Sequence, residues 1–195
     1  MVETEFGITS DFEIPDINGK KTSVMKVNHI GSNANLGYLM DHGITQNGGG
    51  KKVNQYSIVF DVLFTGVGNG WASLLNMDAL GDGDVFWRRN DGGLGQGSNG
   101  YEPDDPEIKI NTGQWHRIVL AVDLAQGLYE KYVDGIYHSS QTNSGLDGRQ
   151  SMDTTSWLFN DNDGENGEIY VAAIQIRNGK VSQDEARALG ASSAL

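Results

Sequence analysis

The stretch Thr112–His138, TGQWHRIVLAVDLAQGLYEKYVDGIYH, carries the most regular pattern in the chain. Apolar residues alternate with mixed ones over Trp115–Val122, and a period of two is typical of a half-buried β-strand. A turn-like segment, Asp123–Gly127, separates this run from a second strand-like run, Leu128–Val133, which stops at Asp134-Gly135. Asp-Gly is a strong signal for a two-residue hairpin turn. The stretch therefore predicts consecutive antiparallel strands that serve as scaffold.

Similar short segments recur along the chain, and each is bounded by Gly, Asn or Asp. Many short strands separated by such turns are typical of an all-β sandwich or barrel. One segment, Gln55–Phe64, is apolar on both faces, which places it in the middle of a sheet. We expect strands at Ser23–Val27, Tyr38–Met40, Gln55–Phe64, Ala72–Met77, Val85–Arg89, Glu107–Ile110, His116–Asp123, Leu128–Val133, Ile136–His138, Ser156–Phe159 and Ile169–Arg177.

The sequence predicts one short helix, close to the C-terminal end of the chain. Ser182 is a suitable N-cap, and Glu185 stands three residues later, as in a capping box. Gly190 is a suitable C-terminal stop. The expected fold class is therefore all-β, an antiparallel two-sheet β-sandwich with one short C-terminal helix.

The composition fits a single globular domain over residues 1–195. This length is large enough to bury a core of its own, and β-sandwiches commonly reach it as one unit. The 27 glycines are spread along the chain next to Asn and Asp, which indicates turns rather than a linker. Because the chain contains no cysteine, neither disulfides nor thiolate metal sites hold the fold.

The net charge of −12 argues against two classes of partner. Nucleic acid and anionic membranes would both be repelled, and no basic stripe offsets the charge. No apolar run is long enough for a membrane span, so membrane insertion is not expected. The opening MVETEFG lacks the basic flank and apolar stretch of a signal peptide. If the protein is secreted, this chain is then expected to be an excised module.

Three segments together suggest a family. They are WHRIVLAVDLAQGLYEKYVDG (Trp115–Gly135), WLFNDNDGENGEIYVAAIQIRNGKVSQDEARALG (Trp157–Gly190) and YLMDHGITQNGGGKKVNQYSIVFDVLF (Tyr38–Phe64). The chain from about Gly37 to Gly190 resembles the concanavalin A-like jelly rolls of the laminin G-like type, in particular the modules of bacterial secreted multidomain proteins.

The resemblance implies a jelly-roll β-sandwich that acts as a carbohydrate-binding accessory module of a larger secreted or cell-surface bacterial protein. Its partner would be a polysaccharide or oligosaccharide, and a neighbouring catalytic domain is a further potential partner. Because one fold hosts many functions, two alternatives stay open. One is a structural or protein-interaction module that packs against a neighbouring catalytic domain. The other is a glycoside hydrolase or polysaccharide lyase on the same fold.

The candidate ligand site lies in Asn76–Gly95, NMDALGDGDVFWRRNDGGLG. Sugar sites use an aromatic face for stacking and planar polar groups for the hydroxyls. Strand alternation places Trp87 on the same face as Arg89, and we expect Phe86 to point into the core. Trp87 would then stack on a sugar, while three polar side chains would bind its hydroxyls or pair with a charged sugar, namely Arg89, Asp78 and Asp84. Alternatively, Trp87 is a core residue and the arginines balance the nearby aspartates.

A second candidate site is the acidic loop NDNDGENGE, residues 160–168. Calcium binds six to eight oxygens, which flexible loops supply from carboxylates and carbonyls. A structural Ca²⁺ would be held by Asp161, Asp163, Glu165 and Glu168. Such Asn-Asp-Gly sequences are equally ordinary turn chemistry.

A catalytic site is not expected. Glu102, Asp104 and Glu107 resemble, in their spacing, the acidic motif of the related laminarinase-like jelly rolls, which are glycosidases. Two prolines, Pro103 and Pro106, interrupt it, and proline is excluded from the central strands on which such a pair would have to share one face. We therefore expect a solvated acidic turn there and a protein that is not an enzyme.

Overall fold

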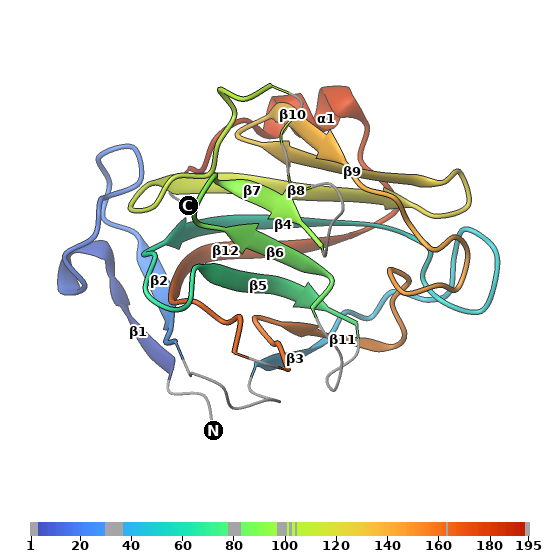
Figure 1. Cartoon of the computed structure of the whole chain (residues 1–195), viewed down its shortest axis with the longest axis horizontal. Helices are drawn as coiled ribbons and strands as arrows, with labels where there is room; N and C mark the ends of the chain where they lie inside the picture. The colour runs from blue at the N-terminus through green and yellow to red at the C-terminus, as the bar shows by residue number, and fades with distance from the viewer. Residues whose placement is uncertain are drawn as a thin grey trace.

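The chain folds into two antiparallel sheets packed face to face (Figure 1). The computed structural model describes residues 4–29, 37–77, 83–96, 101, 103, 105–162 and 164–193. In sheet order, the seven-stranded sheet contains β1 (Thr4–Ile8), β2 (Ser23–Val27), β12 (Ile169–Asn178), β4 (Gln55–Phe64), β8 (Trp115–Asp123), β9 (Leu128–Val133) and β10 (Ile136–Ser140). The five-stranded sheet contains β3 (Tyr38–Asp41), β11 (Thr155–Leu158), β5 (Trp71–Asn76), β6 (Val85–Arg88) and β7 (Gly93–Gly95). The expected fold class is confirmed.

Ten of the eleven expected strands are present, with ends that shift by at most two residues. The exception is Glu107–Ile110, where the expectation of a strand is wrong. Over the described residues, the N–H of Ile110 donates to the carbonyl of Gly92, and this one backbone–backbone hydrogen bond is not continued into a ladder. Two further strands, β1 and β7, were not expected. Both are short and contain glycine, which weakens the strand pattern in the sequence.

The opening stretch forms the meander of β8, β9 and β10. In the turn between β9 and β10, Asp134 and Gly135 have φ of 52° and 81°, as a tight hairpin turn of this handedness requires. Ile136 pairs with Val133 directly across that turn. The predicted hairpin is therefore confirmed, together with its turn.

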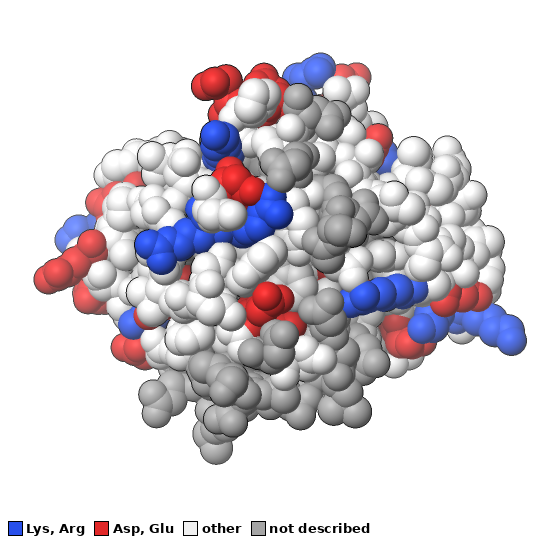
Figure 2. Space-filling view, in the orientation of Figure 1, with Lys and Arg blue, Asp and Glu red and all other residues white. Residues whose placement is uncertain are grey.

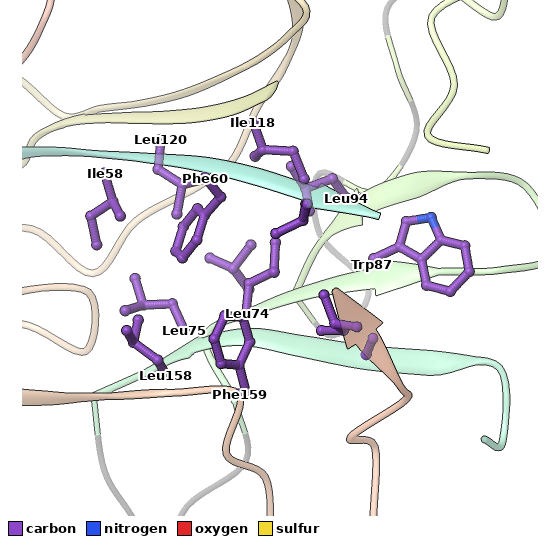
Figure 3. Close-up of a cluster of buried hydrophobic side chains, with 14 of the residues drawn as sticks. Ile58, Phe60, Leu74, Leu75, Trp87, Leu94, Ile118, Leu120, Leu158 and Phe159 are labelled. Carbon is purple, nitrogen blue, oxygen red and sulfur yellow. The ribbon is translucent and has the colours of Figure 1, made fainter. Parts of the chain in front are cut away.

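The main core lies between the two sheets (Figure 3). One side comes from β4 and β8, and the other from β5, β6, β7, β11 and the residue after β11. The labelled residues are Ile58, Phe60, Ile118 and Leu120 on the first side, and Leu74, Leu75, Trp87, Leu94, Leu158 and Phe159 on the second. The outer face of the seven-stranded sheet is also covered, since Val59 and Val119 pack under Ala186 of α1 (Gln183–Leu189). Strand β4 is thus buried on both faces, as its sequence predicts.

Helix α1 begins and ends where the sequence indicates. The Ser182 hydroxyl accepts a hydrogen bond from Glu185 N–H, and the Glu185 side chain accepts one from Ser182 N–H, which completes the capping box. Gly190 is the C-cap. The described residues include no helix with the length and hydropathy of a membrane-spanning segment.

Candidate functional site

Trp87 is a core residue, and the expectation that it stands exposed on β6 is wrong. Only 2% of its surface is accessible, and its ring stacks on Phe64 at a centroid distance of 4.5 Å. Its indole N–H donates to the carbonyl of Ile110 at 3.0 Å. Alternation along β6 therefore places Val85 and Trp87 between the sheets. Phe86 takes the outer face and is buried there as well, so the hydrophobic pattern of this strand does not reveal which face is the core.

Asp84 is also inaccessible to a ligand, with 1% of its surface exposed. One carboxylate oxygen accepts a hydrogen bond from Arg149 Nε at 2.6 Å, and the other accepts from Met77 N–H at 2.7 Å. Asp84 therefore ties the loop that carries Arg149 to the start of β6. Asp78 lies outside the described residues.

Arg89 is exposed and lines a pocket of about 480 Å³ on the outer face of the five-stranded sheet. The pocket lies between the loop that leads into β5 and the turn that follows β6. Its described lining residues are Gly68, Asn69, Gly70, Trp71, Arg88, Arg89 and Asn90. Basic side chains gather on this face over one end of β6 (Figure 2). Of the four residues proposed for ligand binding, Arg89 is the one that the structure places on an accessible surface.

Trp71 is the aromatic side chain of this pocket. It is half-buried at the first position of β5, directly opposite Arg88 of β6. Its ring makes edge-to-face contacts with Phe86 and Tyr101, at centroid distances of 6.4 Å and 5.5 Å. These neighbours fix the orientation of the indole, while its remaining surface borders the pocket.

Sequence reasoning missed Trp71 because the expected strand began at Ala72, which left the tryptophan in the preceding loop. The informative signal was its position immediately after GVGNG. Gly68 and Gly70 have φ of 119° and 100°, conformations that favour glycine, so this loop reverses sharply before the tryptophan.

Arg88 is held in place by its neighbours. Its guanidinium forms a two-point ion pair with Asp91 and lies 4.7 Å from the centre of the Tyr101 ring. Burial would raise the pKa of Asp91, but hydrogen bonds from Arg88 and from Gly93 N–H outweigh burial and hold that pKa below its usual value. The carboxylate therefore stays charged, and Arg88 becomes a fixed part of the pocket wall.

Arg89 is anchored by fewer contacts. Its backbone N–H donates to the carbonyl of Gly70, and Nη1 donates to the carbonyl of Gly66 at 2.9 Å. None of the ion pairs among the described residues includes Arg89. Since a guanidinium carries five N–H donors, several remain directed away from this carbonyl. The site thus combines an aromatic ring, a fixed guanidinium and a more open guanidinium.

The acidic loop is tightly organised around Asp161, which is fully buried. Its two carboxylate oxygens accept hydrogen bonds from the backbone N–H groups of Gly83, at 3.3 Å, and Glu165, at 2.9 Å. The carbonyl of Glu165 accepts in turn from Ser73 N–H of β5. Asp161 therefore fastens this loop to the five-stranded sheet.

The other residues proposed as calcium ligands are dispersed or not described. Glu168 pairs with Lys26 of β2 at 3.3 Å, and Asp163 lies outside the described residues. Over the described ranges, no three His, Asp or Glu side chains form a group suited to a metal ion. Calcium binding therefore stays a prediction.

Of the three carboxylates with glycosidase-like spacing, only Glu107 is described. It is exposed in a turn, where its N–H donates to Asp105 at 3.0 Å. Glu102 and Asp104 lie outside the described residues. The expectation that the protein is not an enzyme stays a prediction.

Comparisons with known proteins identify the fold and leave the family open. No protein-family model matches the chain, and no curated protein sequence matches it. Among solved structures, Trypanosoma rangeli sialidase in complex with the inhibitor DANA has a TM-score of 0.59 at 16% identity, covering 86% of this chain and 27% of the sialidase. The receptor-binding domain of botulinum neurotoxin D has a TM-score of 0.57 at 14% identity, covering 96% of this chain and 47% of that chain.

A third similar structure is domain 4 of AbnA, a GH43 extracellular arabinanase from Geobacillus stearothermophilus, in complex with arabinotriose. Its TM-score is 0.50 at 16% identity, and the match covers 95% of this chain and 81% of that domain. The chain spans between about a fifth and a half of the sialidase and toxin chains that it matches. At these identities the likeness shows the fold alone, a β-sandwich shared with these domains.

Proposed function

We propose that this domain is a non-catalytic carbohydrate-binding module that binds a polysaccharide or oligosaccharide reversibly. The observation that carries the proposal is the pocket in which Trp71 lies beside Arg88 and Arg89. An indole face can stack on the C–H groups of a sugar ring, while the guanidinium groups and the Asn69 and Asn90 amides can hydrogen-bond its hydroxyls. Of the site expected from the sequence, this pocket keeps Arg89, and Trp71 takes the place of the buried Trp87, while Asp84 is inaccessible.

The comparisons support the same class of function. The AbnA domain is described in complex with arabinotriose, and a Trypanosoma rangeli sialidase in complex with sialic acid. We propose further that the domain is of the laminin G-like type and belongs to a larger secreted or cell-surface bacterial protein. A neighbouring catalytic domain is a further proposed partner. The two alternatives, a protein-interaction module and an enzyme, stay predictions.

The proposal can be tested by affinity gel electrophoresis through a panel of neutral and acidic polysaccharides, with calcium and with a chelator. We expect at least one polysaccharide to retard the wild-type domain. W71A should lose the retardation, and W71F, which keeps an aromatic face, should retain part of it. Migration of the wild type that is the same in every gel would reject the proposal.

Trp157 offers a matched control. It is also half-buried, and it lies on β11 of the same sheet, on the other side of β5 from β6. W157A therefore removes a comparable ring at a position outside the pocket, and it should bind like the wild type. Equal loss of binding in W71A and W157A would indicate a general disturbance of the sheet instead of a site at Trp71.

A further inference from the structure

We propose that the ligand of the Trp71 pocket is an anionic glycan, and that Arg89 recognises its carboxylate or sulfate groups. This inference rests on the proposed function, because it names the ligand class of the same pocket. It depends on the different situations of the two neighbouring arginines.

Arg88 is already neutralised, whereas Arg89 is not. The Arg88 guanidinium pairs with Asp91 through two nitrogens and packs against Tyr101, so its charge is compensated within the wall of the pocket. Among the residues that the structure describes, the Arg89 side chain has one hydrogen-bond partner, the uncharged carbonyl of Gly66, and it is exposed. Guanidinium groups match carboxylates and sulfate-like anions through pairs of parallel N–H donors. Arg89 therefore retains both its charge and donors for an anion.

The residues around the pocket also favour an anionic ligand. None of its described lining residues carries a carboxylate. Lys109 lies directly across the turn that follows β6, since a Cβ added to Gly92 would be 3.1 Å from the Cβ of Lys109. Lys109 is exposed and, like Arg89, takes part in no ion pair among the described residues. Arg89 in the pocket and Lys109 beside the turn that follows β6 are therefore two cations without an ion-pair partner among the described residues.

The net charge of −12 does not contradict this attraction, because most of that charge lies too far from the pocket to act on a bound sugar. At physiological ionic strength, exposed charges are screened beyond about 8 Å, so a bound sugar responds mainly to the cations it contacts. The excess of carboxylates elsewhere would slow the approach of a long polyanion at low salt, but it does not remove the local attraction. We therefore expect short anionic oligosaccharides to bind more tightly at equilibrium than short neutral ones.

The test compares polymers that share a backbone and differ in charge. Oligogalacturonate is paired with its methyl ester, which removes the carboxylate charge, and sulfated dextran oligomers are paired with dextran oligomers. Equilibrium binding of each pair is measured for the wild type at low and high salt. We expect the charged member of at least one pair to bind about tenfold more tightly or better, and to lose affinity as salt rises. The pair that responds distinguishes carboxylate from sulfate recognition.

Two arginine variants assign the effect to a residue. R89Q removes the proposed anion-binding group, and R187Q makes the same change of net charge on an exposed residue of α1. R89Q should bind both members of the responding pair equally, whereas R187Q should keep the wild-type preference. Equal affinity of the wild type for charged and neutral members, or an unchanged preference in R89Q, would overturn the inference.

The result also separates this inference from the proposed function. If the wild type binds the neutral oligosaccharides as tightly as the charged ones, and W71A binds neither, the domain is a carbohydrate-binding module without anion recognition. If no carbohydrate of either kind binds the wild type, the proposed function fails and the inference fails with it.

Discussion

Asp61 and Arg117 form a buried ion pair with two parallel hydrogen bonds on the outer face of the seven-stranded sheet. The residues are direct cross-strand neighbours on β4 and β8, and both N–O distances are 2.7 Å. A third donor of Arg117 reaches the carbonyl of Leu189 at 2.6 Å, and the Ser192 hydroxyl donates to Asp61. The pair therefore joins the centre of the sheet to the segment at the end of α1.

We expect removal of the arginine charge to destabilise the domain strongly. R117M would leave the Asp61 carboxylate buried without a counter-ion, and breaking such a pair costs on the order of 3–5 kcal/mol. Urea denaturation of the variant measures this loss. R187Q is the control, because the Arg187–Asp184 pair is exposed on α1 and should leave the unfolding midpoint unchanged. A midpoint for R117M equal to that of R187Q would show that the buried pair is dispensable.

The two tryptophans of the β5–β6 hairpin should respond in opposite ways to truncation. W87A removes a core ring and the hydrogen bond to Ile110, and we expect a loss of about 3–5 kcal/mol in the free energy of unfolding. W71A should lower stability less, because Trp71 is half-buried, and should instead abolish glycan binding. Denaturation and glycan binding, measured on both variants, separate the two roles. A W87A variant with wild-type stability would contradict the core assignment.

The scaffold could be predicted from the sequence where strand period and turn chemistry agree. The run from Trp115 to Val133 has both, and Asp134-Gly135 adds a turn that only residues tolerant of positive φ adopt readily. The capping residues of α1 were equally informative, because capping depends on neighbours only three residues apart. In these segments, local rules and the tertiary fold favour the same structure.

The candidate site could be predicted only in part, because β6 is apolar on both faces. Alternation groups Val85 with Trp87, but it cannot indicate which group faces the other sheet when Phe86 is buried too. That orientation is decided by the stacking of Trp87 on Phe64, which is distant in sequence. Arg89 was found because it is polar at the end of the strand, whereas Trp71 joins it only through the pairing of β5 with β6.

Asp161 should stabilise the fold whether or not calcium binds. In D161A, the buried N–H of Gly83 and the partly buried N–H of Glu165 lose their acceptor, and a buried donor left unsatisfied costs about 1–3 kcal/mol. Thermal unfolding in a chelator should therefore show a lower melting temperature than the wild type. D153N is the control for charge, because Asp153 is exposed in a different loop. A D161A domain as stable as D153N would refute this role.

The same variants test the calcium prediction. If Ca²⁺ binds in the acidic loop, added calcium should raise the melting temperature of the wild type and of D153N, but not that of D161A. The reason is that the stabilisation follows from binding to the folded state alone. A wild-type melting temperature that is equal in calcium and in chelator would reject a structural calcium ion.

His138 should make stability depend on pH. It is fully buried on β10, its Nδ1 lies 2.7 Å from the Ser139 hydroxyl, and its buried Nε2 has no hydrogen-bond partner among the described residues. Burial, and then the positive charge of Lys131, lower its pKa from 6.5 to about 4. Below pH 6.5 the unfolded chain takes up a proton that the folded chain refuses. The contribution of neutral, buried His138 to the free energy of unfolding is therefore fully present above pH 6.5, and it is lost progressively as the pH falls towards 4.

Between pH 7 and pH 5 we expect the free energy of unfolding to fall by about 2 kcal/mol through this residue. Urea denaturation across that interval measures the slope for the wild type and for H138N, in which the titrating group is absent. The interval lies above the usual pKa range of Asp and Glu, and the lowered pKa values of Asp91, Asp147 and Glu185 place their own contributions at still lower pH. The slope should therefore be smaller in H138N than in the wild type. An equal slope in both proteins would show that another group is responsible.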